Sequence, residues 1–153
     1  MLIKDATRKD YKIVNDLLVK LNNYHADNAP DFCEHVKRYF TKKRYEKLLD
    51  KGDKWFLALD NENVVGIVGV RVWQTEKKQY TINELYVDEN YRHKGIGKKL
   101  LETAMMYARR NIEENKDFSR HISLGVYEFN KDAKALYEKM GFVPQSHMLS
   151  YEI

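Results

Sequence analysis

The segment of residues 83–101 carries the residue types and spacing that point most clearly to chemistry. An extended apolar run ends at Val87, a short polar loop follows, and Arg92-x-x-Gly95-x-Gly97 then opens an amphipathic helix. That order gathers backbone N–H groups at a helix N-terminus, which is a site for a diphosphate. Glycine suits such a loop because a side chain would hold the phosphates away from the backbone. The spacing fits neither the Gly-x-Gly-x-x-Gly dinucleotide motif nor the Gly-x-x-x-x-Gly-Lys-Ser/Thr P-loop.

A second pattern runs from Asn130 to Phe142 and reads Asn-Lys-Asp-Ala-Lys-Ala-Leu-Tyr-Glu-Lys-Met-Gly-Phe. It predicts a helix with Asn130 as its N-cap and Gly141 as its C-cap. A purely structural interpretation accounts least well for Tyr137, because a phenol at this place can equally be the edge of a core or part of a site.

The first segment closely resembles the pyrophosphate-binding motif of the GNAT superfamily of acetyl-CoA-dependent N-acetyltransferases. The second resembles the downstream GNAT pattern Asn-x-x-Ala-x-x-Leu-Tyr-x-x-x-Gly-Phe at every defined position. The resemblance is strong over residues 81–142. Elsewhere it is limited to the arrangement of the predicted helices and strands. It implies one α/β domain over residues 1–153, with a mixed, mostly antiparallel twisted sheet and helices on both faces. The implied activity is acetyl transfer from acetyl-CoA to a primary amine.

The resemblance also implies roles for particular residues. In the family, a backbone N–H of the strand that ends here at Val87 commonly donates to the oxyanion. The tyrosine at the place of Tyr137 lies near the acetyl-CoA sulfur, where it can protonate the departing thiolate. The expected acetyl-CoA site comprises Leu85, Tyr86, Val87, Arg92, His93, Lys94, Gly95, Ile96, Gly97, Lys98 and Asn130.

A base or a water chain is also needed, because only a neutral amine attacks a thioester. Glu84 is the candidate base, since it lies in the strand beside the expected cleft; the alternative is an exposed or salt-bridged strand carboxylate. In polyamine acetyltransferases of this superfamily, the proposed base sits one residue earlier, where this chain has Asn83. This departure argues against a polyamine substrate and leaves a water chain open.

Hydrophobic periodicity predicts the elements that position these residues. A capping box at Thr7 and Asp10 should precede a helix. The strand before the glycine loop and the strand that follows the long helix should be parallel, because they form a crossover unit. The predicted strands are residues 1–5, 55–60, 64–73, 80–87, 121–127 and 142–153. The predicted helices are residues 11–21, 32–48 with a break near Thr41, 95–115 and 131–140, with a polar loop at 22–31.

Composition narrows the function further. The net charge of +4 suits an anionic ligand such as CoA, but it is too mild to indicate nucleic acid. No apolar run reaches membrane-spanning length and no signal-peptide pattern opens the chain, so we expect a cytoplasmic protein without a membrane partner. The single Cys33 excludes an internal disulfide, and the five histidines lack metal-ligand spacing, so no metal is expected.

The sequence therefore predicts an N-acetyltransferase that acts on a primary amine of a small molecule. Two alternatives stay open: a peptide or protein N-acetyltransferase, and a non-catalytic acyl-CoA-binding module. The acceptor amine is not identified by the sequence, and a homodimer is open as well.

Overall fold

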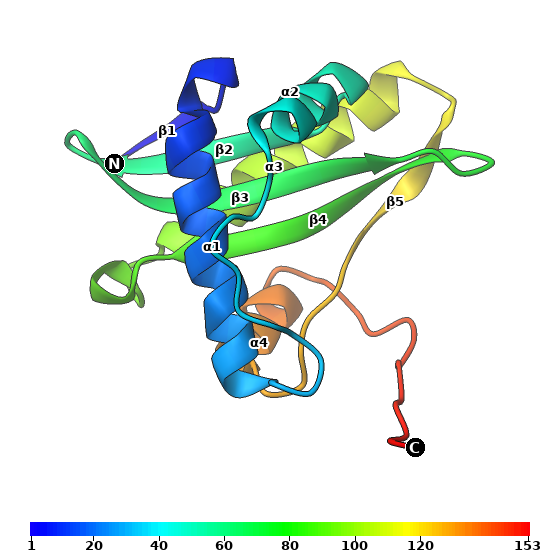
Figure 1. Cartoon of the computed structure of the whole chain (residues 1–153). Helices are drawn as coiled ribbons and strands as arrows, with labels where there is room; N and C mark the ends of the chain where they lie inside the picture. Colours follow the sequence, from blue (N-terminus) through cyan, green and yellow to red (C-terminus); the bar gives the residue numbers. More distant parts are fainter.

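Five strands form one sheet in the order β1-β2-β3-β4-β5, so strands that follow one another in the chain are neighbours in space (Figure 1). The computed structural model describes all of residues 1–153. The strands are β1 (Leu2–Asp5), β2 (Lys54–Asp60), β3 (Asn63–Trp73), β4 (Lys78–Val87) and β5 (Phe118–Leu124). The helices are α1 (Tyr11–Asn28), α2 (Lys42–Lys51), α3 (Ile96–Glu114) and α4 (Lys131–Lys139), with 3-10 turns η1 (Arg8–Asp10) and η2 (Glu89–Tyr91).

The sheet is antiparallel from β1 to β4, and β5 is parallel to β4. The parallel pair arises because α3 carries the chain across the sheet between the two strands. The prediction of a mixed, mostly antiparallel sheet flanked by helices is confirmed. None of the helices is both long and apolar enough to span a membrane.

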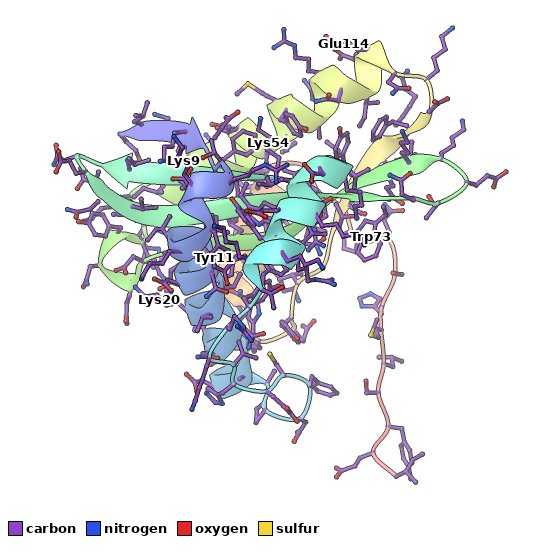
Figure 2. The ribbon with its side chains drawn as sticks, turned by 45° about the horizontal axis from the view of Figure 1, so that its top comes forward. Lys9, Tyr11, Lys20, Lys54, Trp73 and Glu114 are labelled. Atoms are coloured by element: carbon purple, nitrogen blue, oxygen red, sulfur yellow. The ribbon has the colours of Figure 1, made fainter.

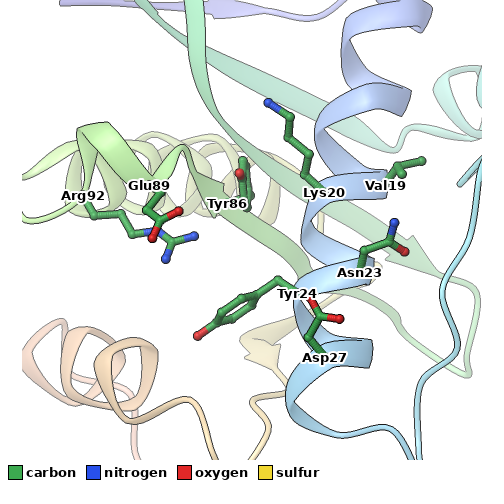
Figure 3. Close-up of a pocket in the computed structure, with 8 residues that line it drawn as sticks. All are labelled: Val19, Lys20, Asn23, Tyr24, Asp27, Tyr86, Glu89 and Arg92. Carbon is green, nitrogen blue, oxygen red and sulfur yellow. The ribbon is translucent and has the colours of Figure 1, made fainter.

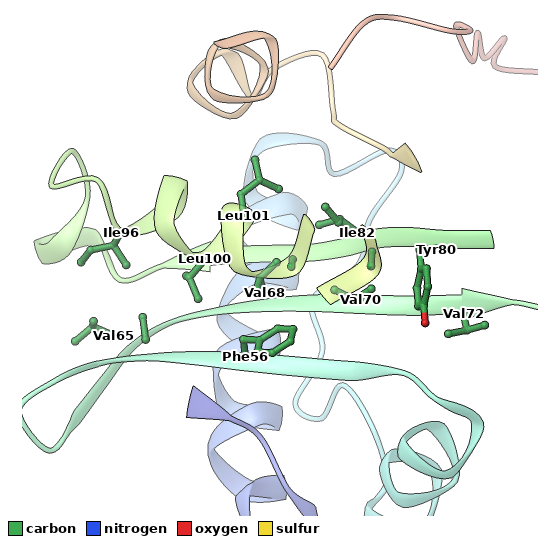
Figure 4. Packing of buried hydrophobic residues seen from close by; sticks show 13 residues of the cluster. Phe56, Val65, Val68, Val70, Val72, Tyr80, Ile82, Ile96, Leu100 and Leu101 are labelled. Carbon is green, nitrogen blue, oxygen red and sulfur yellow. The ribbon is translucent and has the colours of Figure 1, made fainter. Parts of the chain in front are cut away.

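Two hydrophobic clusters cover the two faces of the sheet. Under α3, side chains such as Val68 and Val70 pack against Leu100 and Leu101 (Figure 4). On the opposite face, α1 and α2 cover a cluster that is centred on the fully buried Trp55. Helices on both faces leave the edges and ends of the strands as the places where a ligand can reach the backbone.

A β-bulge in β4 changes the direction of the side chains that follow it. Val70 of β3 pairs with Ile82 of β4, and the neighbouring Gly69 pairs with Glu84. Asn83 therefore has no partner in β3 and is the extra residue of the bulge. Ile82 faces the α3 cluster. Strict alternation would put Glu84 on that same face, but the bulge turns its side chain to the face of α1 and α2.

β4 and β5 part at the bulge. Their last paired residues are Ile82 and Leu124, and β5 ends there, while β4 continues to Val87. The backbone edge of residues 83–87 that faces away from β3 therefore has no strand beside it. This edge lies between α4 and the body of the sheet (Figure 1).

The capping box of Thr7 and Asp10 is confirmed, but four predicted boundaries are wrong. The polar residues 22–28 continue α1, because the buried Ala26 and the ring of His25 pack against the fold. Residues 32–41 are not helical, since asparagines of α1 bind their backbone. β5 lies three residues earlier than predicted, at Phe118–Leu124. The closing segment, residues 142–153, forms no strand, because no strand lies beside it.

Candidate active site

The glycine loop ends in an uncapped helix N-terminus, as a diphosphate site requires. Gly95 is the N-cap of α3 with φ +79°, and no side chain accepts from the first turn of the helix. His93 also has a positive φ of 60°. Two residues in the left-handed backbone region so close together turn the chain sharply. The N–H groups of the first turn of α3 remain available as hydrogen-bond donors.

Gly97 lies where α3, α4 and β4 converge. A methyl group added there would meet Leu136 Cδ2 at 3.5 Å and Val87 Cγ2 at 3.8 Å, which are ordinary contacts. The fold itself therefore does not require a glycine at this position. Close approach of a ligand to the backbone gives a reason for glycine that internal packing does not.

The basic side chains of the loop have different surroundings. Arg92 Nε donates to Val87 O at 3.0 Å, and its guanidinium lies over the rings of Tyr24 and Tyr86. Arg92 thus joins the loop to β4 and α1, and it borders a cavity of ≈ 350 Å³ between α1 and the end of β4 (Figure 3). Lys94 lies over Tyr91, and Lys98 is 3.7 Å from Glu102.

The remaining residues that were predicted for an acetyl-CoA site have other surroundings. Ile96 is buried, so only its backbone can meet a ligand. Leu85 and Val87 pack on the α3 side and Tyr86 on the α1 side, which leaves their backbone at the unpaired edge. Asn130 caps α4, and its side-chain oxygen accepts from Ala133 N at 3.2 Å.

Glu84 is buried at the centre of a polar cluster on the face of α1 and α2. Its Oε1 lies 3.4 Å from both Tyr39 Oη and Arg71 Nη1. Arg71 in turn donates to the buried Asp53, which also accepts from Val72 N. Glu84 Oε2 and Trp55 Nε1 make no hydrogen bond of good geometry, although the indole lies close enough to the carboxylate to oppose the rise of its pKa. An unpaired carboxylate oxygen in the interior is costly, and such a group merits a functional explanation.

Burial sets the protonation of Glu84. Desolvation raises its pKa to about 7, and the nearby Arg71 guanidinium opposes the rise. A carboxylate with a pKa near neutrality is suited to accept a proton from an amine at physiological pH. The bulge and Gly69 make this placement possible, because a Cβ on Gly69 would lie only 2.0 Å from Glu84 Oε2.

The segment between α1 and α2 covers Glu84, and α1 holds that segment by its asparagines. Asn15 Oδ1 accepts from the backbone N–H groups of Tyr39 and Phe40 at 2.9 and 3.1 Å. Asn23 exchanges two hydrogen bonds with the backbone of Val36. These contacts fix Tyr39 over the carboxylate and leave Glu84 only 2% exposed.

Tyr137 is half-buried on α4, on the α3 side of the sheet. Its ring packs near Phe142, and no hydrogen bond involves its hydroxyl. Burial raises its pKa to about 12, so the phenol stays protonated at neutral pH and can act as a donor. Glu84 and Tyr137 thus belong to opposite faces of the sheet, on either side of the strand whose edge is free.

Sequence reasoning missed Tyr39, Asp53 and Arg71. A signal was present for Arg71, since a charged residue interrupts the apolar run of β3 and an unpaired charge is seldom buried. Asp53 sits between a helix and a strand, where a capping role is the ordinary interpretation. Tyr39 gave no signal, because its place depends on a segment without regular structure.

We expect Gly97→Val to weaken binding of CoA about tenfold or more, because its side chain would displace the diphosphate from the backbone N–H groups. Isothermal titration calorimetry with CoA measures this. Gly97→Ala is the matched control for stability, since alanine favours the helix and its methyl group fits. Unchanged CoA affinity in a folded Gly97→Val protein would refute the diphosphate site.

The stability of the protein should depend on pH through Glu84. Its folded pKa of about 7 lies above the ordinary 4.5, so its contribution is fully present below pH 4.5 and is lost as pH rises through 7. Glu84→Gln does not titrate. Between pH 4.5 and 7, the urea midpoint of Glu84→Gln should therefore rise relative to that of the wild type. Above pH 7 the difference between the two midpoints should stay constant. A constant difference across this window would contradict the raised pKa.

The parting of β4 and β5 beside an uncapped helix N-terminus belongs to an α/β fold of GNAT type. The acetyltransferase (GNAT) family model matches residues 18–142. The chain therefore belongs to this family of acyltransferases, which confirms the resemblance seen in the sequence.

The chain is also similar to proteins that are named N-acetyltransferases. The uncharacterized N-acetyltransferase MJ1207 of Methanocaldococcus jannaschii is 29% identical over 91% of this chain and 66% of its own length. N-alpha-acetyltransferase 30 of Xenopus laevis is 35% identical over 63% of this chain and 34% of its own length. The chain thus spans two thirds or less of these relatives.

Solved structures show the same fold. A mutant of the BH1408 protein from Bacillus halodurans has a TM-score of 0.85 at 24% identity and covers 100% of this chain and 99% of its own. The aminoglycoside acetyltransferase meta-AAC0020 from a soil metagenomic sample, in complex with sisomicin, has a TM-score of 0.68 at 18% identity, with 99% and 94% covered. At these identities the likeness concerns the fold alone.

Proposed function

We propose that this chain transfers an acetyl group from acetyl-CoA to a primary amine of a small molecule. The observation that carries the proposal is the pairing of two features along β4. An uncapped helix N-terminus follows the strand, and a buried carboxylate with a pKa of about 7 projects from it. The first feature suits a diphosphate and the second suits removal of a proton.

Acetyl-CoA would supply an activated acyl thioester. The first turn of α3 would hold its diphosphate, with Gly95 and Gly97 allowing close approach. The backbone edge of residues 83–87 could receive the extended part of the molecule through hydrogen bonds, apart from Val87 O, which already accepts from Arg92. An N–H group of this edge would also stabilise the oxyanion that develops during transfer.

Glu84 would accept the proton of the attacking amine. Because Tyr39 covers the carboxylate, the proton would travel through a water molecule or after a movement of the Tyr39 side chain. Arg71 and Asp53 would hold the carboxylate in place, and burial would keep its pKa near 7. Tyr137 would donate its proton to the departing thiolate from the other face of the sheet.

A small-molecule acceptor is favoured by the closed surroundings of Glu84. The α1–α2 segment is bonded to α1 along its length, which leaves no open groove over the carboxylate. The fold neighbour bound to the aminoglycoside sisomicin is compatible with this class. A peptide acceptor is the second candidate, because N-alpha-acetyltransferase 30 is among the relatives.

The cytoplasm is the proposed location, and one domain over residues 1–153 is the proposed organisation.

An acetyl-CoA-dependent screen over amines, amino acids and peptides tests the proposal. Release of the CoA thiol would be followed for each acceptor. We expect at least one small amine to turn over faster than every peptide. Turnover with peptides alone would favour the second candidate, and acetyl-CoA binding without turnover would favour a non-catalytic module.

A further inference from the structure

Two buried carboxylates, those of Asp53 and Glu84, share a single buried guanidinium, that of Arg71. The side chains of Asp53 and Glu84 are 0% and 1% exposed, and that of Arg71 is 11% exposed. α1 and α2 lie over the face of the sheet to which this cluster belongs (Figure 2). One guanidinium balances the charge of only one carboxylate, so the two carboxylates compete for it.

Asp53 is the better partner of Arg71. The Nε of Arg71 donates to Asp53 Oδ2, and the backbone N–H of Val72 donates to Asp53 Oδ1 at 2.8 Å. Lys51 Nζ, which is partly exposed to solvent, lies 3.7 Å from the same Oδ1. Hydrogen bonds of this kind favour the ionised form of a carboxylate.

Glu84 receives much weaker contacts. The distance between Arg71 Nη1 and Glu84 Oε1 is 3.4 Å, which is long for a charge-assisted hydrogen bond. The Tyr39 hydroxyl lies 3.4 Å from the same oxygen, and Oε2 makes no hydrogen bond of good geometry. Of the two carboxylates, Glu84 is therefore the one that takes up a proton more readily.

The position of Arg71 between the two carboxylates is fixed by its surroundings. Its Cζ lies 5.8 Å from the centroid of the Phe40 ring and 5.9 Å from that of Trp55. A planar guanidinium that stacks on aromatic rings has a preferred orientation, which a lysine ammonium would lack. This packing keeps the Nε of Arg71 directed at Asp53 and only Nη1 near Glu84.

We propose that Asp53 is a positioning residue for the base: it holds the charge of Arg71, so that Glu84 can gain and lose a proton during turnover. The inference rests on the proposed role of Glu84 as the base. Without Asp53, the full charge of Arg71 would act on Glu84 and keep it ionised. The titratable groups that face Glu84 come from β3 (Arg71), the start of β2 (Asp53) and the α1–α2 segment (Tyr39). Desolvation raises the pKa of Glu84 to about 7, Arg71 opposes this rise, and Asp53 supports it.

The titration of Glu84 in the full chain tests the inference without a measurement of activity. Carbon-13 NMR of protein labelled at the glutamate carboxyl carbon follows the protonation, and Glu84→Gln identifies the signal by its loss. In Asp53→Asn the titration midpoint of Glu84 should fall by about one pH unit or more, because an unopposed guanidinium favours the carboxylate. Asp50→Asn is the matched control, since Asp50 pairs with Arg8 at the surface. Its midpoint should equal that of the wild type.

A double variant, Asp53→Asn with Arg71→Met, shows whether Arg71 causes the fall. It removes the cation together with its partner, so it leaves no unpaired charge between them. Glu84 should then titrate at or above the wild-type midpoint. An unchanged or raised midpoint in Asp53→Asn, or a midpoint below that of the wild type in the double variant, would overturn the inference.

The pH dependence of kcat/KM connects the inference with catalysis. In Asp53→Asn, the rise of kcat/KM with pH should move to lower pH by the same interval as the NMR midpoint. A purely structural role of Asp53 would instead lower the rate at every pH. A moved midpoint with an unmoved rate profile would support the role of Asp53 in the charge balance and remove Glu84 from the role of base. If neither moves, Asp53 only stabilises the fold and the inference fails.

Discussion

Tyr137→Phe should lower the rate of acetyl transfer by about 10²-fold or more, in line with the loss of a general acid. The variant keeps the ring and its packing near Phe142, so stability and acetyl-CoA affinity should change little. The raised pKa of about 12 keeps the wild-type phenol protonated, and its hydroxyl has no partner within the protein to lose. Single-turnover kinetics should measure the effect, because product release can hide a change in chemistry.

Tyr45→Phe is the matched control for Tyr137→Phe. Burial raises the pKa of Tyr45 to about 12 as well, but its hydroxyl donates to Thr7 O on the other face of the sheet. This control should lose some stability and keep the wild-type rate. If Tyr137→Phe also turns over at the wild-type rate, Tyr137 is a packing residue and solvent protonates the thiolate.

Glu84→Gln should lower kcat/KM at neutral pH by about 10²-fold, because glutamine cannot accept the proton of the amine. In the wild type, kcat/KM should rise as pH increases through about 7, since the base must be deprotonated to act. The variant should lack this rise and recover part of its activity at higher pH, where more amine is already neutral. A pH–rate profile of both proteins provides the measurement.

Glu62→Gln controls for the loss of a carboxylate, since Glu62 is exposed in the turn between β2 and β3. It should retain the wild-type profile. A Glu84→Gln variant with an unchanged profile would remove Glu84 from the role of base. A water chain without a protein base would then be the route for the proton.

The features that the sequence predicted are local. Gly95 and Gly97 follow a strand within a few residues, and Asn130 caps a helix three residues before Ala133. Such spacing determines the local backbone geometry without contacts to distant residues. The parallel pairing of β4 and β5 followed from the crossover unit, which is also local in sequence, whereas the place of β1 beside β2 was not predicted.

The surroundings of Glu84 could not be predicted, because they depend on contacts between distant residues. The bulge at Asn83 reverses the face of Glu84. Its one sign in the sequence is a change of phase in the alternation, from Tyr80 and Ile82 to Leu85 and Val87 on the same face. Tyr39 reaches the carboxylate only because Asn15 of α1 binds its backbone. The helix predicted over residues 32–41 was wrong for the same reason, since side chains of another element satisfy that backbone. The strand predicted over residues 142–153 was also wrong, because that segment pairs with no strand of the sheet.

The measurement that tests the central claim most directly is the identification of the products by mass spectrometry. The purified chain would be incubated with acetyl-CoA and the best amine from the screen, and both products would be quantified over time. The account predicts one N-acetylated amine for each CoA thiol released, with both signals reduced together in Glu84→Gln and in Tyr137→Phe. Thiol release without an acetylated amine, or equal acetylation in the wild type and both variants, would contradict it.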